Sequence, residues 1–594
     1  MRAEHFTEQG TAALLVPLLD RRQKIEYAIW VALWLFALTD FWLWWLQPEH
    51  NIGTWRFLLA SVLLAWATLL PLYFIAIFIS SRAPNKSIVP HSDWRIAMVV
   101  TKAPSEPFSV VRETLEAMLK QEFPHDVWLA DEDPSDETLS WCSRNGVRVS
   151  TRKGLSEYHR PTWPRRTRCK EGNLAYFYDN YGYDNYDFVC QMDADHVPAP
   201  NYLMEMLRPF NDPSVGYVSA PSICDKNAAQ SWSARGRLHV EGTLHGALQA
   251  GYSGGLAPLC IGSHYAVRTA ALKEIGGLGP ELAEDHSTSL LMNAGGWRGV
   301  HAIDAIAHGA GPATFADLAI QEFQWSRSLM TIFLQHTPRY LARLPVRLRM
   351  QFVFCQLWYP LFAGSMLLKF LVPIIALIGD RNMVGVTYPE FVVRFLGPSM
   401  VLVAMAFWWR RHGWTRPRDS KVLSWEGTLF LFARWPWVLM GTLTAAVDTV
   451  RGRTAQFRVT PKGEQSRHLP LRVLAPYAIL SIGSALPVVL LSGIAQARGF
   501  YFFAMVNCLV YAILLVVIVV QHQRENPASA RSWDRGMAAA SSALVAAVVA
   551  IAVVAIPLRL PQGVSAMTAG IERIARHINQ NIVREWEDTI AVWR

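Results

Sequence analysis

Long runs of apolar residues alternate with polar stretches and divide the chain into three regions. A helix needs about 20 apolar residues to cross the hydrocarbon core of a bilayer. Seven runs meet or approach this length, two before a long polar region and five after it. They occupy residues 27–46, 57–80, 352–378, 392–409, 473–491, 500–520 and 538–556. We therefore expect about seven transmembrane helices and one large soluble domain.

Basic residues near the apolar runs predict the orientation, because Lys and Arg are enriched on the cytosolic side. Arg21, Arg22 and Lys24 precede the first run, whereas the loop 47–53 contains neither Lys nor Arg. The polar region 90–349 is then expected in the cytosol.

Three further segments are predicted to lie at the membrane surface. The apolar stretch 429–447 has basic flanks and contains Arg434, whose charge would be costly inside the bilayer, so we interpret it as an interfacial helix. Residues 339–350 alternate Arg with apolar residues in a similar way. Apolar residues recur every three or four positions over 567–593, which predicts an amphipathic helix on the outer side. That helix could anchor to the surface, form oligomers or bind an outer partner.

The polar region alternates strand and helix patterns, which favours an α/β fold with a mostly parallel sheet. Ligands bind such sheets at the carboxyl ends of the strands. The expected strands are 94–101, 127–130, 147–151, 188–193 and 215–220, and the expected helices are 110–121, 172–180 and 201–210.

The composition does not indicate a particular function, but it disfavours several classes of protein and site. Of the 594 residues, 52% are hydrophobic and 17% charged, a mixture typical of membrane segments plus a soluble domain. The net charge of +9 is largely explained by the cytosolic loops, so no nucleic acid partner is expected. None of the seven cysteines forms a CxxC pair, which disfavours a zinc or disulfide framework, and no cleavable signal peptide is predicted.

Two acidic motifs follow predicted strands. Asp193 and Asp195 form a DxD motif directly after the apolar run 188–190. Close carboxylates repel one another unless a cation lies between them, and Mg²⁺ or Mn²⁺ with phosphate oxygens meets that need. Asp131 follows another strand and could bind a base or ribose. A solvated acidic turn and helix capping are the alternatives.

Two further motifs could provide charges around a diphosphate and an acceptor. Lys170 and Asn173 lie in a Lys-Glu-Gly-Asn sequence that could open a helix, with the lysine facing phosphate. Asp285 lies in Ala-Glu-Asp-His at another predicted helix start, where it could serve as a general base or simply cap the helix.

Gln321, Trp325 and Arg327 occupy a helical stretch just before the membrane. A Trp ring offers a flat apolar face for a sugar, and Gln offers both donors and acceptors. Packing of the Trp beneath the domain is the alternative. The polar loop 456–463 carries no chemistry that physics alone demands, and contact with lipid would explain it.

Together these motifs resemble the family 2 glycosyltransferases, and within them the cellulose synthase-like processive enzymes. The residues that carry the resemblance are KEGN at 170–173, DAD at 193–195, AED at 283–285, QEFQW at 321–325 and FRVTPKG at 457–463. LCIGS at 259–263 loosely resembles the acceptor-site finger loop. The resemblance implies a GT-A-type domain in a multi-pass protein of the bacterial inner membrane.

The resemblance also implies an inverting transfer from a UDP-sugar to a growing polysaccharide. Asp285 would be the base, Asp193 and Asp195 would hold Mg²⁺ or Mn²⁺, and Asp193 would also contact the donor. The remaining substrate-binding residues would be Asp131, Lys170, Asn173, Gln321, Trp325 and Arg327, together with Phe457, Val459, Thr460 and Lys462 of a gating loop. The gating-loop match makes UDP-glucose and a β-glucan the expected donor and product.

The expected divisions of the chain are 1–89 with two spans, 90–335 as the GT-A domain, 336–450 with interfacial helices and two spans, 451–468 as the gating loop, 469–557 with three spans, and 558–594 as the C-terminal helix.

Departures from the family pattern leave alternatives open. Gln324 stands where the family has Arg, so Arg327 could supply that charge, and no motif for binding cyclic-di-GMP follows the last spans. Another UDP-sugar, a non-processive transfer to a lipid carrier, and a chain that binds donor without turnover all remain possible. A transporter is also open, because Asp40, Lys369 and Asn507 lie within apolar runs.

Overall fold

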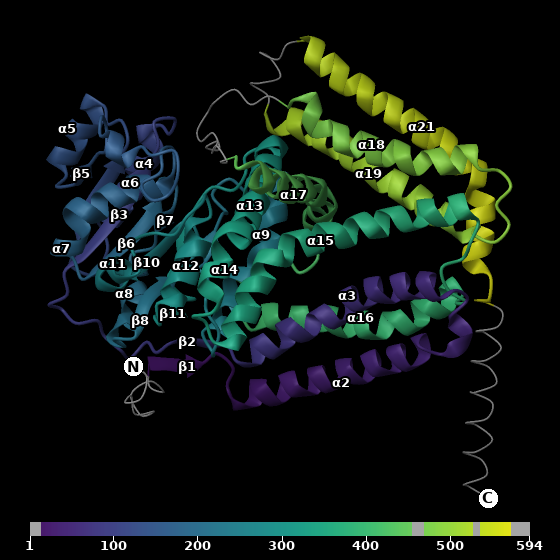
Figure 1. The fold of residues 1–594 in the computed structure, drawn as a ribbon, viewed down its shortest axis with the longest axis horizontal. Helices are drawn as coiled ribbons and strands as arrows, with labels where there is room; N and C mark the ends of the chain where they lie inside the picture. The colour runs from purple at the N-terminus through teal and green to yellow at the C-terminus, as the bar shows by residue number, and fades with distance from the viewer. Residues whose placement is uncertain (1–13, 454–468, 527–534, 572–594) are drawn as a thin grey trace, which may run out of the picture.

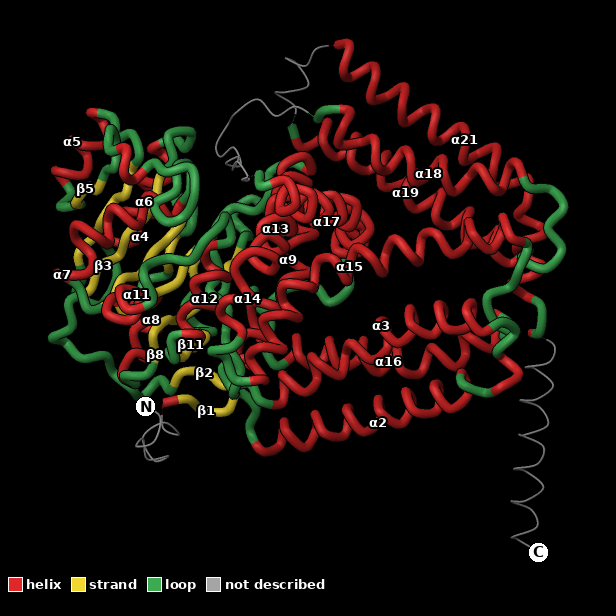
Figure 2. Tube along the Cα trace, in the orientation of Figure 1, coloured by secondary structure: helices red, strands yellow, loops and turns green. Residues whose placement is uncertain are grey.

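The computed structural model describes residues 14–453, 469–526 and 535–571. It shows an α/β domain on one side and a set of long helices on the other (Figure 1). Figure 2 shows that the strands lie within the first part, apart from the long helices. This is the arrangement predicted from the sequence.

A seven-stranded sheet forms the centre of the α/β domain, in the order β11-β8-β10-β6-β3-β4-β5. Neighbouring strands are parallel except for β10, which is antiparallel to both β6 and β8. The mostly parallel sheet predicted from the sequence is therefore confirmed, with β10 and β11 as strands that were not predicted. Its strands are β3 (Ile96–Lys102), β4 (Asp126–Asp131), β5 (Arg148–Ser150), β6 (Phe188–Asp193), β8 (Val215–Ser219), β10 (His264–Arg268) and β11 (Arg298–His301).

Burial on both faces explains why these strands form. All seven residues of β3 are buried, as are the first five of β6, so each reads as a continuous apolar run rather than an alternating one. The covering helices are α4 (Phe108–Met118), α5 (Asp136–Arg144), α6 (Lys170–Phe177), α7 (Tyr183–Asn185), α8 (Tyr202–Leu207), α11 (Thr269–Glu274) and α12 (Glu284–Ala294).

A second group of elements joins the domain to the long helices. The short strands β7 (Val197–Pro198), β9 (Ser222–Ile223) and β12 (Ala307–His308) form a three-stranded sheet. The helices of this region are α9 (Trp232–Thr243), a π-helical segment (Leu244–Leu248), α10 (Gln249–Tyr252), α13 (Phe315–Thr331) and α14 (Thr337–Leu341).

Eight helices in the described part of the chain are long and apolar enough to span a membrane. Seven of them match the seven predicted apolar runs, to within one residue at the ends of the runs 27–46, 57–80 and 473–491. They are α2 (Arg21–Trp45), α3 (Thr54–Ile79), α15 (Val346–Gly379), α16 (Tyr388–Arg411), α18 (Leu471–Leu490), α19 (Gly499–Glu525) and α21 (Arg535–Thr568). Strand β1 (Leu15–Pro17) pairs with β2 (Arg82–Pro84), so the chain returns to the same side after α2 and α3.

The eighth helix, α17 (Trp425–Arg451), contains the stretch predicted to be interfacial. By length and composition it also qualifies as a span. However, Figure 1 shows it nearly end-on, whereas the other long helices run across the view. It packs against α9 and α13, next to the α/β domain.

The stretch 339–350 is not one continuous element. It contains the end of α14, a connection that reaches Pro345, and the start of α15. Pro345 is the N-cap of α15, and because proline has no backbone N–H it cannot continue α14 into α15 as one helix. The expected C-terminal helix and gating loop lie largely or wholly outside the described residues.

Candidate active site

Three strands of the sheet end side by side in charged residues. Lys102 ends β3, Asp131 ends β4 and Asp193 ends β6. The Lys102 ammonium lies 3.2 Å from the fully buried Asp131 carboxylate. Burial raises the pKa of Asp131, although the Asp133 N–H and the Lys102 ammonium oppose that rise. Lys102 was not singled out from the sequence, although it follows an apolar strand as the two aspartates do.

Asn173 anchors helix α6 to this sheet edge. Its Nδ2 donates a hydrogen bond to the Ala130 carbonyl at 2.9 Å, one residue before Asp131. The side chain is almost fully buried, and its Oδ1 lacks a hydrogen-bond partner. Asn173 therefore sets the position of α6, and hence of Lys170 at its first turn.

Lys170 connects two further parts of the site. Its Nζ donates to Asp193 Oδ1 at 2.8 Å and to the Gly262 carbonyl at 2.7 Å. Burial alone would lower the pKa of Lys170, but the carboxylates of Asp193, Glu284 and Asp285 outweigh it and raise the pKa above its ordinary value. The lysine is thus held charged among acidic groups.

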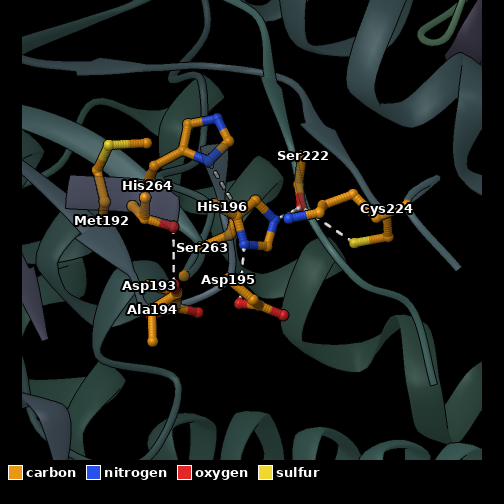
Figure 3. A network of polar contacts seen from close by, with 12 residues as sticks. Met192, Asp193, Ala194, Asp195, His196, Ser222, Cys224, Ser263 and His264 are labelled. Atoms are coloured by element: carbon orange, nitrogen blue, oxygen red, sulfur yellow. Dashed lines mark hydrogen bonds and ion pairs between the residues drawn. The ribbon is translucent and has the colours of Figure 1, made fainter. Parts of the chain in front are cut away.

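The DxD motif forms a compact acidic cluster with the next residue. Asp193, Asp195 and His196 offer ligand atoms that all lie within 4.8 Å of one another. The His196 Nδ1 donates to Asp195 Oδ1 at 3.2 Å, and its Nε2 lies 3.4 Å from Ser222 Oγ (Figure 3). Because both imidazole nitrogens have partners, the carboxylates are the better candidates to hold a metal, with His196 orienting Asp195.

The loop 259–263 passes between this cluster and α12. The Ser263 carbonyl accepts from the Asp193 N–H at 2.8 Å. On the other side, a methyl group added to Gly262 would lie 3.2 Å from Asp285 Oδ2. Gly262 thus lies between two residues of the site. Its carbonyl accepts from Lys170, and its Cα faces the Asp285 carboxylate. The sequence only weakly indicated this role, because the motif match there was loose.

Asp285 lies in the first turn of α12 beside Glu284. Burial raises the pKa of both carboxyls, and their mutual repulsion adds to the rise at Glu284. Backbone N–H groups and Lys170 oppose the rise at Asp285. Glu284 is 4% exposed, whereas Asp285 is only partly buried and therefore better placed to meet a substrate.

Helix α12 is attached to two elements of the membrane-proximal region. The Ala283 N–H donates to Ser328 Oγ of α13 at 2.9 Å. Gln356 of α15 accepts from Thr337 through Oε1 at 2.9 Å and donates through Nε2 to His286 at 3.0 Å. Burial lowers the pKa of His286 to about 4, so the ring is neutral and can accept that bond. The first turn of α12 is therefore fixed to α13 and α15.

The predicted acceptor residues share helix α13. Gln321 Oε1 accepts from Arg237 of α9 at 3.0 Å, and the Arg237 guanidinium lies 4.1 Å from the centre of the Trp325 ring. Arg327 instead pairs with Asp448 of α17 at 2.5 Å. The guanidinium expected to replace the missing family arginine is thus engaged at the α13–α17 contact. Arg237 is 84 positions from Gln321 in sequence and was not identified there.

The structure does not place the four gating-loop residues. Phe457, Val459, Thr460 and Lys462 lie outside the described residues.

Comparison with known proteins identifies the kind of domain that carries this site. Residues 93–328 match the model of the family described as glycosyltransferase like family 2. The chain is 26% identical over 284 residues to the UDP-forming cellulose synthase catalytic subunit of Xanthomonas axonopodis pv. citri (strain 306), covering 46% of this chain and 37% of that protein. It is 25% identical over 313 residues to the cellulose synthase 1 catalytic subunit of Komagataeibacter xylinus, covering 50% and 40%. The matches thus span about two fifths of these relatives' length.

Solved structures with similarity include glucosyl-3-phosphoglycerate synthase from Mycobacterium tuberculosis in complex with Mn²⁺, UDP and phosphoglyceric acid. It is 16% identical with a TM-score of 0.28, covering 40% of this chain and 78% of that one. S. aureus TarS 1-349 is 15% identical with a TM-score of 0.27, covering 61% and 94%. From the family match and the cellulose synthase relatives, we conclude that residues 93–328 form a glycosyltransferase family 2 domain, joined to helices long enough to span a membrane.

Proposed function

We propose that this protein is a processive inverting glycosyltransferase that polymerises a β-glucan from UDP-glucose and passes it across the bacterial inner membrane. The observation that carries the proposal is the convergence at Gly262, where Lys170 and Asp285 meet beside Asp193. A cation for the diphosphate and a base for the acceptor are then close enough to serve one transfer.

The donor would lie along the carboxyl ends of the strands. Asp131 would accept hydrogen bonds from the base or ribose, and Asn173 has a buried carbonyl oxygen that lacks a partner. Lys170 would face the diphosphate as a point charge. The carboxylates of Asp193 and Asp195 fit Mg²⁺ or Mn²⁺, because these ions prefer oxygen ligands. When bound, the ion would neutralise charge on the departing UDP.

Asp285 would act as the general base. Its oxygen would take the proton of the acceptor hydroxyl while that oxygen attacks the anomeric carbon and UDP leaves, in a single displacement. Its raised pKa suits this task, because a base with a pKa nearer neutrality binds the proton more strongly while remaining largely ionised. Lys170 nearby helps to keep it ionised.

The acceptor chain would run from this base toward the membrane helices. Gln321 and Trp325 lie on α13, which is attached to α12 through Ser328 and to α17 through Arg327. Phe457, Val459, Thr460 and Lys462 would close over the donor, and the α/β domain would face the cytosol. The domain divisions predicted from the sequence are retained as part of this proposal.

Other sugars and acceptors give testable alternatives. A different UDP-sugar would keep every role above, and a non-processive enzyme would give short, lipid-linked products. Asp40, one of the polar residues that left a transporter open, forms an ion pair between α2 and α16 with Arg394 at 2.8 Å. A structural ion pair explains its place in an apolar run, so it no longer supports a transporter. A chain that only binds donor would bind the UDP-sugar without transferring or releasing its sugar.

Asp285→Asn provides the test. The variant is nearly isosteric and removes the base, so it should retain UDP binding and lose incorporation of labelled glucose by at least about 100-fold. Near-normal polymer synthesis by folded Asp285→Asn protein would refute the proposal.

A further inference from the structure

The side chain of Arg237, a residue of α9, contacts the two predicted acceptor residues of α13, Gln321 and Trp325. Its guanidinium stacks over Trp325 at 4.1 Å, and its Nη1 donates to Gln321 Oε1 at 3.0 Å. On its other side, its Nε donates to Glu241 Oε2 at 3.0 Å. The side chain is 12% exposed, so these contacts hold it in one place.

These contacts restrict what Gln321 and Trp325 can offer a sugar. A glutamine amide has one acceptor oxygen and one donor NH₂ group. Because Arg237 donates to the oxygen, it takes one of the two acceptor positions of Gln321 and fixes the orientation of the amide, so that the NH₂ group can donate to a sugar oxygen. The guanidinium also covers one face of the Trp325 ring, so a pyranose ring can stack only on the opposite face.

A chain of contacts links Arg237 to the acidic cluster. Burial would raise the pKa of Glu241, but Arg237 and His245 lower it to about 2, so this carboxylate is charged. The Ser222 N–H donates to His245 Nδ1 at 3.4 Å, which leaves the ring proton on Nε2, 3.6 Å from Glu241. Ser222 Oγ in turn contacts His196, as Figure 3 shows. The arginine is thus fixed relative to both sides of the site.

We propose that Arg237, held by Glu241, is a positioning residue for the sugar acceptor. It fixes the ring plane of Trp325 and the amide orientation of Gln321, so that the terminal hydroxyl of the acceptor meets the base in a productive geometry. This inference rests on the proposed function. It assigns a role to an arginine that none of the sequence motifs contains.

A simpler explanation is that Arg237 forms only a structural ion pair. Arg235 provides a matched control on the same helix, because it pairs with Glu426 of α17 at 3.0 Å and lies 3.8 Å from Glu525 of α19. Its side chain is 25% exposed. Arg235→Ala therefore removes a paired arginine from α9 without removing the Trp325 and Gln321 contacts.

The experiment compares Arg237→Lys, Arg237→Ala and Arg235→Ala in the full chain reconstituted in lipid. Two quantities are measured: the dissociation constant for UDP, and the ratio of glucose transferred into polymer to glucose released by hydrolysis of UDP-glucose. Lysine keeps the charge but can neither stack as a plane nor donate from two sides. Both Arg237 variants should bind UDP within about twofold of wild type and lower the transfer-to-hydrolysis ratio on the order of tenfold.

The outcomes separate the two proposals. A wild-type ratio in the Arg237 variants, or an equal fall in Arg235→Ala, would overturn the positioning role. If Arg237→Ala loses UDP binding through misfolding, Arg237→Lys decides. Absence of transfer from any UDP-sugar by the wild-type protein would instead overturn the proposed function.

Discussion

The buried ion pair between Glu322 and Arg434 predicts a specific loss of stability. Glu322 of α13 is fully buried, and Arg434 of α17 lies 2.8 Å away and is 11% exposed. Arg434 is also surrounded by the rings of Phe430, Phe362 and Tyr359, at 4.9, 5.5 and 5.6 Å. Arg434→Met would fill much of this space and leave Glu322 without its counter-ion.

The size of the stability loss follows from the cost of protonating Glu322 once Arg434 is removed. Burial already raises the pKa of Glu322 with Arg434 present, so without it the carboxyl should take up a proton. Protonating a glutamate of ordinary pKa, about 4.3, at pH 7 costs about 3.7 kcal/mol. This lies within the range of about 3–5 kcal/mol for breaking a buried pair. With an unfolding entropy of ~2.1 cal/mol/K per residue over 594 residues, the melting midpoint should fall by about 3 °C.

The assay is a double-mutant cycle in detergent that follows the fraction of folded protein on heating. Arg434→Met should be destabilised at pH 7 and less so at pH 5, where protonation costs less. The double variant Glu322→Gln with Arg434→Met should recover most of the loss, because it leaves no buried charge. The reasoning about this pair is wrong if the melting midpoint of Arg434→Met equals that of the wild type. It is also wrong if the double variant has a lower melting midpoint than Arg434→Met.

Three further predictions concern the site. Because Asp285 must be ionised to act and burial raises its pKa, kcat/KM should fall as the pH decreases, with a midpoint above the ordinary aspartate value of about 3.9; a midpoint at or below that value in a pH–rate profile would contradict this. Gly262→Ala should reduce transfer at least about tenfold while UDP binding stays intact, since its methyl crowds the Asp285 carboxylate; unchanged turnover in the labelled-sugar assay would count against the site. Removing divalent cations with EDTA should abolish transfer, and Mg²⁺ or Mn²⁺ should restore it, whereas Asp193→Asn should need more cation for half-maximal rate; activity in metal-free buffer would exclude the assigned metal role.

Several parts of the fold and site could be predicted because their signals are local. An apolar run followed at once by a carboxylate predicted the ends of β4 and β6, and thus Asp131 and Asp193. The spans followed from run length alone. Strand β10 was missed because its five residues, His264–Arg268, begin and end in polar side chains, and antiparallel insertion into a parallel sheet leaves no local pattern.

Contacts between distant segments account for the rest. Nothing near Trp325 in sequence indicates that Arg237 covers its ring, and nothing near Arg327 indicates that Asp448 is its partner. The position of α17 raises the same difficulty, because its composition suits a span, yet it packs against α9 and α13 beside the α/β domain as well as against the long helix α15. Glu322 is an example in which the sequence showed a polar residue on a helix and the fold buried it with Arg434.

The most direct test of the central claim is synthesis and export by the purified full chain in sealed lipid vesicles, with radiolabelled UDP-glucose and Mg²⁺ supplied outside. For chains whose catalytic domain faces outward, we predict high-molecular-weight product that a β-glucan-specific glucanase digests only after detergent opens the vesicles, and no product from Asp285→Asn. Product that the external enzyme degrades fully without detergent would contradict export, and equal product from Asp285→Asn would contradict the assigned chemistry. No polymer from UDP-glucose or any other UDP-sugar would contradict the account as a whole.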